Sequence, residues 1–240
     1  MTNQSKFTVS CGQCGLNELC LPHALTAQEI DQVDSIVKRS KPLQRGEYLY
    51  NTGEVFSSIY AVRSGSIKVF TIDDEGEEQV IGFYLPGELL GLDAIDSKLH
   101  MSTAKSMETS SVCEIPYDSI EDLSATIRNL QVHMYRVLSR EIRVDQELQM
   151  LLAKKTAEER IGAFLMNLSL RYEQRRLSST RFRLPMARSD IGNYLGLAVE
   201  TVSRIFTRLQ TMGVLTVEGK EVEILDRNAL CNVAHSREVA

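Results

Sequence analysis

The sequence contains no hydrophobic run that approaches the length of a membrane-spanning helix. Residues 1–10 are polar and lack the apolar core of a signal peptide, so we expect a cytoplasmic protein with no membrane partner. Internal repeats and low-complexity segments are absent, as is any arrangement of paired carboxylates, or of serine with histidine, in the context of a catalytic motif. We therefore expect a globular protein that is not an enzyme, and 240 residues are enough for two domains.

Positive charge is scarce, because 27 Lys and Arg residues stand against 32 Asp and Glu residues and give a net charge of −5. This acidic balance argues against nonspecific nucleic-acid binding by the chain as a whole. The charges are unevenly distributed, since residues 156–240 carry 12 Lys or Arg and 10 Asp or Glu, whereas residues 1–155 carry 15 and 22. A basic C-terminal part on an acidic body predicts a local contact with nucleic acid.

Cysteine is also scarce, but three of the five cysteines lie within ten residues: Cys11, Cys14 and Cys20. Disulfides are uncommon in cytoplasmic proteins, so this clustering indicates a metal or redox site. A closed site needs a fourth ligand, and Cys113 is better placed than Cys231, which lies near the far end of the chain. The spacing favours an iron–sulfur cluster over a structural zinc site, in which His23 could replace Cys113, and over free thiols.

Glycine and proline are absent from residues 127–154, where apolar residues recur at spacings of three and four: Ile127, Leu130, Met134, Val137, Leu138, Ile142, Leu148 and Leu152. This stripe predicts a helix of roughly 40 Å that packs against a second copy in a homodimer. A long core helix within one chain is the alternative. Asp145 interrupts the stripe and would face its own copy, so we expect Ile142 and Asp145 to control the strength of the dimer.

Short alternating runs between glycines predict a small double-sheet jelly roll ahead of that helix. The expected strands fall at residues 47–50, 58–63, 66–72, 78–83 and 111–115. A helix capped by Thr26 is expected at residues 26–39, with Glu29 completing a capping box. A hairpin turn is expected at residues 73–76, and a short helix at residues 117–125.

Residues 186–209 carry a second strong pattern, in which Gly192 is small where two helices would cross and Gly196 makes the turn between them. The pattern predicts a helix-turn-helix with its second helix at residues 198–210, followed by a β-hairpin wing at residues 214–225. An ordinary helical hairpin is the alternative. The exposed face of the second helix would present Val199, Glu200, Ser203, Arg204, Thr207 and Arg208.

That face suits the major groove of double-stranded DNA. Arginine can bridge O6 and N7 of guanine, glutamate can accept a hydrogen bond from cytosine N4, and valine can contact a thymine methyl group. We expect Arg204 to read a base, whereas Arg208 and Arg188 are better placed for phosphates.

The order of a cysteine-rich arm, a jelly roll, a long helix and a winged helix resembles the CRP/FNR superfamily of bacterial regulators, and its FNR/ANR branch in detail. The motifs that carry the resemblance are Cys11-Gly-Gln-Cys14, Cys20-Leu-Pro, Thr109-Ser-Ser-Val-Cys113-Glu-Ile-Pro, Arg140-Glu-Ile-Arg-Val-Asp145-Gln and residues 190–204. The resemblance implies that one oxygen-labile 4Fe-4S cluster per chain is bound by Cys11, Cys14, Cys20 and Cys113. It also implies that Glu200, Ser203 and Arg204 read a two-fold symmetric DNA site.

The expected organisation is α+β: a cluster-binding arm at residues 1–25, a β-roll sensor domain at 26–126, a dimerisation helix at 127–155 and a winged helix-turn-helix domain at 156–240. The expected function is an oxygen-responsive transcription regulator that dimerises while its cluster is intact and controls anaerobic genes. The main alternative is a zinc-stapled regulator or interaction module that senses nitric oxide or redox state. The helix-turn-helix argues against a third reading, an electron carrier.

Three further expectations concern partners and the cluster. A cyclic nucleotide is not expected, because residues 99–104, where the family's arginine for the cyclic phosphate would stand, contain neither Arg nor Lys. RNA polymerase is an expected partner, with residues 72–77 as a candidate contact, although a solvated turn would explain them as well. Leu19, an apolar neighbour of Cys20, is expected to shield the cluster from oxygen.

Overall fold

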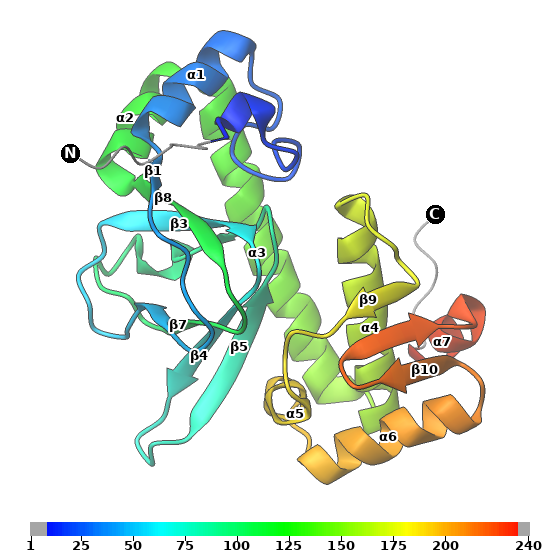
Figure 1. Ribbon diagram of the computed structural model, residues 1–240. Coiled ribbons are helices and arrows are strands. Elements are labelled where there is room, and N and C mark those ends of the chain that lie inside the picture. The colour runs from blue at the N-terminus through cyan, green and yellow to red at the C-terminus, as the bar shows by residue number, and fades with distance from the viewer. Residues whose placement is uncertain (1–8, 235–240) are drawn as a thin grey trace, which may run out of the picture. The chain divides into compact units, whose positions relative to one another are not determined.

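A computed structural model describes residues 9–234 of the chain (Figure 1). The expected arm and the expected DNA-binding part continue into residues 1–8 and 235–240, which lie outside the described residues. The chain forms two compact units. Within residues 9–234, one unit contains residues 9–69 together with Phe83–Arg140, and the other contains Phe70–Gly82 together with residues 141–234. No helix among residues 9–234 has the length and apolar character that a membrane span requires.

The jelly roll expected from the alternating runs is confirmed as two four-stranded sheets. The first has the order β1-β8-β3-β6, with β1 at Lys38–Arg39, β8 at Ser111–Pro116, β3 at Ser58–Ser64 and β6 at Leu89–Leu90. The second has the order β2-β7-β4-β5, with β2 at Tyr48–Tyr50, β7 at Thr103–Ser106, β4 at Ile67–Ile72 and β5 at Glu78–Tyr84. The sequence patterns did not reveal β6 and β7, or the short 3-10 helix η2 at Leu92–Ala94.

The expected helix at residues 26–39 is shorter in the structure. Helix α1 spans Ala27–Ile36, and the capping box between Thr26 and Glu29 is present. Val37 is extended, and Arg39 belongs to β1, where it lies opposite Cys113 of β8. Pairing with a strand more than 70 residues away outweighs the local helix propensity of the Lys-Arg pair. This correction moves Arg39 from the end of a helix to the edge of the cysteine region.

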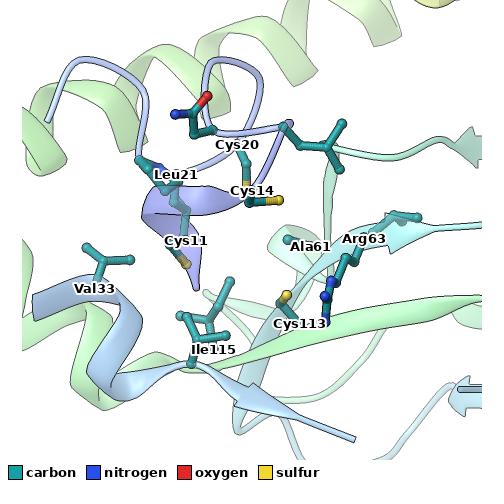
Figure 2. Close-up of a pocket in the computed structure, with 15 residues that line it drawn as sticks. Cys11, Cys14, Cys20, Leu21, Val33, Ala61, Arg63, Cys113 and Ile115 are labelled. Atoms are coloured by element: carbon teal, nitrogen blue, oxygen red, sulfur yellow. The ribbon is translucent and has the colours of Figure 1, made fainter. Parts of the chain in front are cut away.

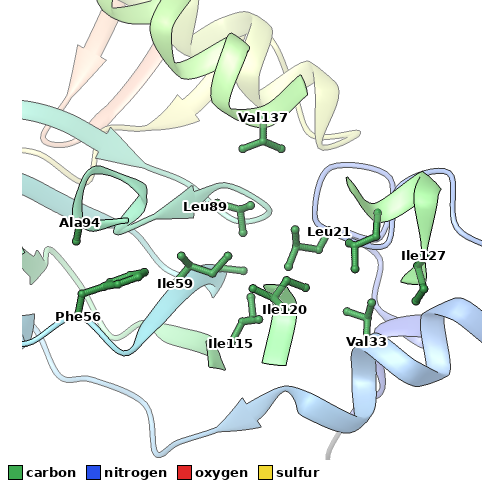
Figure 3. Close-up of a cluster of buried hydrophobic side chains, with 12 residues drawn as sticks. Leu21, Val33, Phe56, Ile59, Leu89, Ala94, Ile115, Ile120, Ile127 and Val137 are labelled. Atoms are coloured by element: carbon green, nitrogen blue, oxygen red, sulfur yellow. The ribbon is translucent and has the colours of Figure 1, made fainter. Parts of the chain in front are cut away.

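The long helix is present as α3 at Arg128–Lys154, directly after α2 at Tyr117–Thr126. The residues of its apolar stripe do not all lie in one interface. Ile127, Leu130 and Val137 are 5 %, 0 % and 8 % exposed and pack into the chain's own core, whose side chains are drawn in Figure 3. Ile142 is 59 % exposed. The expectation that the whole stripe faces a partner is therefore wrong for its first half. The spacing of apolar residues shows that one face of a helix is covered, but not whether the same chain or a second chain covers it.

The second unit contains the expected helix-turn-helix and wing. Helix α4 at Ala157–Gln174 begins at a capping box formed by Thr156 and Glu159. It is followed by β9 at Arg181–Arg183, α5 at Arg188–Leu195, α6 at Val199–Thr211, β10 at Leu215–Glu218, β11 at Glu221–Ile224 and α7 at Arg227–Ala234. The wing is a three-stranded sheet in the order β10-β11-β9 rather than a lone hairpin, and the sequence patterns missed its third strand.

One guanidinium joins three helices of this unit. Arg160 in α4 donates to the carbonyl oxygens of Leu152 and Lys155, where α3 ends, at 2.7 and 3.0 Å. It also donates to the carbonyl of Leu195, the last residue of α5, at 2.9 Å. A helix leaves its last carbonyl groups without partners inside the helix, so Arg160 satisfies the ends of two helices at once. The end of the long helix is thereby tied to the helix-turn-helix.

Candidate functional site

Four of the five cysteines line one pocket of about 450 Å³ in the first unit. Cys11, Cys14 and Cys20 come from the N-terminal arm, and Cys113 comes from β8, as Figure 2 shows. Cys231 lies elsewhere, buried in α7. The structure thus brings together the four cysteines that the sequence singled out, from segments almost 100 residues apart. The rest of the wall is largely apolar and includes Leu21, Val33 and Ile115.

Local hydrogen bonds shape the arm. Cys11 starts the 3-10 helix η1 at Cys11–Gln13, and its backbone N–H donates to Asp34 of α1 at 2.7 Å. Further along, the N–H of Cys20 donates to the carbonyl of Leu16 at 3.0 Å, which closes a turn. Leu21 follows and is 1 % exposed within the core. The arm is therefore held at both ends, by a carboxylate before the cysteine loop and by a core side chain after it.

Burial raises the pKa of three of the thiols that line this pocket, those of Cys11, Cys20 and Cys113. Burial, followed by the hydrogen bond with Asp34, raises the pKa of Cys11 to about 12. Burial also raises the pKa of Cys20 to about 12 and raises that of Cys113, although Arg39 and Arg63 pull the latter back down. A metal centre bound here would have to displace the protons of these thiols, because thiolate is the form that ligates.

The donor set fits a thiolate-bound centre better than a zinc site completed by histidine. Four cysteines are the usual ligands of an iron–sulfur cluster. His23 is not among the residues that line the pocket, and its ring lies 5.4 Å from the ring of His133 in α3. As they stand, the described residues contain no group of three or more His, Cys, Asp or Glu side chains close enough to hold one metal ion.

Leu19 lies at the border of this pocket. A Cβ atom placed on Gly87, which lines the pocket, would come within 2.9 Å of the Leu19 Cβ. Gly87 also has a φ of +92°, a conformation that favours glycine. Leu19 therefore packs directly on the backbone of the β-roll, beside the cysteines.

The helix-turn-helix has the expected geometry. Gly196 ends α5 in the left-handed conformation, with a φ of 62°. A Cβ on Gly192 would lie 2.5 Å from the carbonyl oxygen of Leu197, so only glycine allows the two helices to approach this closely. One face of α6 is buried through Val202, Ile205, Phe206 and Leu209. The opposite face is exposed and carries the expected residues Val199, Glu200, Ser203, Arg204, Thr207 and Arg208.

The three arginines expected to contact DNA differ in their surroundings. Arg204 donates to the Thr201 hydroxyl at 3.1 Å on its own helix. Arg208 pairs with Glu158 of α4 at 3.0 Å and keeps 65 % of its side chain exposed. The guanidinium of Arg188, at the start of α5, lies 3.5 Å above the ring of Phe206, and burial lowers its pKa. Arg204 and Arg208 share the exposed face of α6, whereas Arg188 is packed beneath it.

Comparison with known proteins identifies the chain. Residues 159–233 match the Crp-like helix-turn-helix domain, and residues 40–126 match the cyclic nucleotide-binding domain. Transcriptional activator protein FnrA of Stutzerimonas stutzeri is 53% identical over 224 residues, which cover 93% of this chain and 92% of that protein. The chain belongs to the CRP/FNR family of transcription regulators. It is a transcription regulator with a DNA-binding helix-turn-helix domain, and not an enzyme.

Other relatives agree with this assignment. The fumarate and nitrate reduction regulatory protein of Escherichia coli K12 is 49% identical over 233 residues, covering 97% of this chain and 93% of the relative. Among solved structures, FixK2 from Bradyrhizobium japonicum is 28% identical, covers 85% of this chain and 100% of its own, and superposes with a TM-score of 0.75. The CRP/FNR resemblance seen in the sequence motifs is confirmed.

The sequence patterns did not identify several polar residues that shape these two sites. Arg39, Asp34 and Arg63 surround the cysteines, and Arg160 anchors the helix-turn-helix. Arg39 was concealed by the expected helix at residues 26–39. Arg63 is the outlier of a strand whose neighbours Ala61 and Val62 are buried, and a charged residue in such a run is a signal that could have been used.

Proposed function

We propose that this regulator binds one 4Fe-4S cluster per chain through Cys11, Cys14, Cys20 and Cys113 and responds to oxygen. It dimerises while the cluster is intact and binds two-fold symmetric DNA to control anaerobic genes. The observation that carries the proposal is that these four cysteines line one pocket, while the fifth is buried in α7. Close relatives named as FnrA and as the fumarate and nitrate reduction regulatory protein support it.

The chain contains a short route from this pocket to the long helix. Cys20, Cys113 and Met134 of α3 pack against the same core cluster, which also contains Leu130 and Val137 of α3. Cys113 lies on β8, which continues into α2 and then α3. When bound, the cluster would supply an oxygen-sensitive link between the arm and β8. The arm is then tightly held against this core, and its release would loosen the packing under the first half of α3.

The second half of α3 is the proposed dimer contact. Ile142 and Met150 there are 59 % and 61 % exposed, and large apolar side chains that are this exposed can mark a surface that binds a partner. A second copy of α3 would cover them and would bring two α6 helices to one DNA duplex. Two recognition helices that read adjacent half-sites require a two-fold symmetric site.

Further parts of the proposal concern the domains and partners. We assign the arm to residues 1–25, the sensor to 26–126, the dimerisation helix to 127–155 and the DNA-binding domain to 156–240. The hairpin between β4 and β5 is the proposed contact for RNA polymerase, and Ile72 there is 56 % exposed. No cyclic nucleotide is part of the proposal, because residues 99–104 offer neither Arg nor Lys for its phosphate and several side chains of the roll are themselves buried. His100, for instance, is 3 % exposed and stacks on Tyr50 at 3.8 Å.

Anaerobic purification followed by iron and sulfide analysis tests this function. We expect about four iron and four sulfide per chain, a brown protein and a dimer in sedimentation, all of which are lost in air. Cys20→Ser and Cys113→Ser should abolish the cluster, and Cys231→Ser should retain it. A colourless protein that contains zinc would instead establish the zinc-stapled regulator. Normal cluster loading in Cys113→Ser would refute the ligand assignment.

A further inference from the structure

An ion pair between Arg39 and Asp34 lies beside the cysteines and contacts Cys11. Arg39 of β1 donates from Nη2 to the carboxylate of Asp34 at the end of α1. The same Nη2 lies 3.7 Å from the Sγ atom of Cys11. Asp34 in turn accepts the backbone N–H of Cys11 at 2.7 Å. One Asp–Arg pair therefore contacts both the backbone and the sulfur of this cysteine.

This pair is not an ordinary surface salt bridge. The side chains of Arg39 and Asp34 are only 16 % and 26 % exposed, whereas the neighbouring pair of Lys38 and Glu114 has a lysine that is 64 % exposed. The Nε atom of Arg39 is buried and finds no hydrogen-bond acceptor among residues 9–234. A buried donor without a partner is costly, so its retention beside four cysteines points to an acceptor that arrives with a bound centre.

A second guanidinium faces the pocket. Arg63 of β3 lines the wall, and Figure 2 shows it beside Cys113. Its charge and that of Arg39 both lower the pKa of the Cys113 thiol. A centre held by four thiolates is anionic, and an anion in a half-buried, apolar pocket is stable only when positive charge or hydrogen-bond donors compensate it. Arg39 and Arg63 are the cations that the pocket offers on the side of β1, β3 and β8.

We propose that Arg39, held by Asp34, is a positioning residue that fixes Cys11 for ligation, and that Arg39 and Arg63 together compensate the negative charge of the bound centre. The inference rests on the proposed function, because it assumes that the four cysteines bind an anionic centre. On this inference, the positive charges of Arg39 and Arg63, as well as the cysteine sulfur atoms, select the centre that binds. An ion pair whose only task is to join α1 to β1 would require neither the contact with Cys11 nor Arg63.

The chain provides a matched control for the charge. Arg39→Gln and Lys38→Gln remove the same charge at adjacent positions of β1, but only Arg39 faces the cysteines. Arg39→Lys keeps the charge and loses the forked geometry, and Arg63→Gln removes charge without touching Cys11. For each full-length protein prepared anaerobically, the cluster's midpoint reduction potential and its rate of loss to an iron chelator are measured.

We expect Arg39→Gln and Arg63→Gln each to lower the midpoint potential by about 59 mV, the equivalent of ten-fold in the one-electron equilibrium. They should also speed cluster loss roughly ten-fold, whereas Arg39→Lys and Lys38→Gln should stay within about three-fold of the parent. If Arg39→Gln assembles no cluster, Arg63→Gln still reports on charge. Potentials for Arg63→Gln and Lys38→Gln that equal the parent's would overturn charge compensation.

The positioning part is tested without any cluster. Amide hydrogen exchange at residues 11–14 of the cluster-free protein should quicken roughly ten-fold in Asp34→Asn and in Arg39→Gln, and should be unchanged in Lys38→Gln. Equal exchange in all four proteins would show that the pair does not hold the arm. If the parent itself contains no iron or sulfide, the proposed function fails. The exchange measurement still decides whether the Asp34–Arg39 pair holds Cys11 in place.

Discussion

The side-chain Oδ1 of Asn193 in α5 accepts a hydrogen bond from the backbone N–H of Val80 in β5, at a distance of 2.5 Å. Its Nδ2 donates to the carbonyl of Glu78, and Gln79 donates from Nε2 to the Asn193 carbonyl at 3.1 Å. β5 ends its sheet, so its outer edge presents unpaired backbone groups. A single amide side chain of the helix-turn-helix thus pairs with this edge as a neighbouring strand would. The hairpin that is the proposed polymerase contact is thereby joined to the DNA-binding helices.

Replacing Asn193 by Ala should release this hairpin. The change leaves the Val80 N–H and the Glu78 carbonyl without their partner, and we expect a loss of about 1–3 kcal/mol in the stability of the contact. Amide hydrogen exchange at residues 78–80 should quicken accordingly. Asn232→Ala on an exposed position of α7 is the control. Slow exchange at residues 78–80 in Asn193→Ala would mean that other contacts hold the hairpin.

Arg204 should determine sequence preference, whereas Arg208 should not. Arg204→Ala should relax the preference at one guanine in each half-site by about 1–3 kcal/mol, because a bidentate contact to O6 and N7 is lost. Arg208→Ala should weaken binding to all sequences alike and reduce the dependence on salt, as expected for a phosphate contact. Arg188→Ala should behave in the same way as Arg208→Ala. Competition binding against a set of half-site variants at fixed salt distinguishes the two patterns.

If Arg204→Ala weakened every sequence equally, its proposed role in base readout would be wrong. The control is Asn232→Ala, which changes an exposed residue of α7, outside the helix that enters the groove. Its binding to all half-site variants should match the parent.

Leu19 should protect the bound cluster from oxygen. Leu19 packs on Gly87 beside the pocket, so Leu19→Ala would open a gap next to Cys20 through which small molecules could enter. We expect the cluster to decay several-fold faster in air, and its visible absorbance measures this decay. Decay under argon should be unchanged, and this comparison separates shielding from weaker cluster binding. Equal lifetimes in air for Leu19→Ala and the parent would leave Leu19 as ordinary packing.

The sequence was informative wherever a local pattern determines structure. Apolar spacing located α3 and α6, the capping box marked the start of α1, and cysteine spacing selected the residues that meet at the pocket. It was uninformative wherever the partner is distant in the chain. Nothing near Asn193 indicates that it meets the edge of β5, and nothing near Arg39 indicates a strand paired with β8.

The stripe on α3 shows the same limit. Its period correctly indicates a face that must be covered, but Leu130 and Val137 enter the chain's own core while Ile142 remains exposed. Both outcomes have the same local signature, because a helix with a 3.6-residue period fits either neighbour. Only the long-range packing of the arm and α2 against α3 separates them.

Asp145 is the residue on which we expect the dimer equilibrium to depend. It lies one turn after the exposed Ile142, on the part of α3 proposed to meet a second copy, and partial burial already raises its pKa in the single chain. In a dimer its carboxylate would lose more water and would face a like charge. Both effects oppose association. Such opposition is useful in a switch, because a ligand can shift only an equilibrium that is nearly balanced without it.

Asp145→Ala should therefore dimerise without a cluster. We expect the cluster-free variant to associate at least about ten-fold more tightly than the cluster-free parent, since removal of the charge removes both penalties. Sedimentation of the aerobic proteins measures this directly, and Glu147→Ala, an exposed carboxylate paired with Arg143 on the same helix, is the control. It should remain as monomeric as the parent.

Acidity should act on the parent in the same direction. Association would raise the pKa of Asp145 further, so the dimer binds more protons than two monomers do. The dimer of the cluster-free parent should therefore become more stable as pH falls toward the raised pKa of Asp145, and the Asp145→Ala variant should show a weaker dependence on pH. An Asp145→Ala protein that remained monomeric without its cluster would place Asp145 outside the dimer contact. The exposed face of α3 around Val132 and Tyr135 would then be the surface to test next.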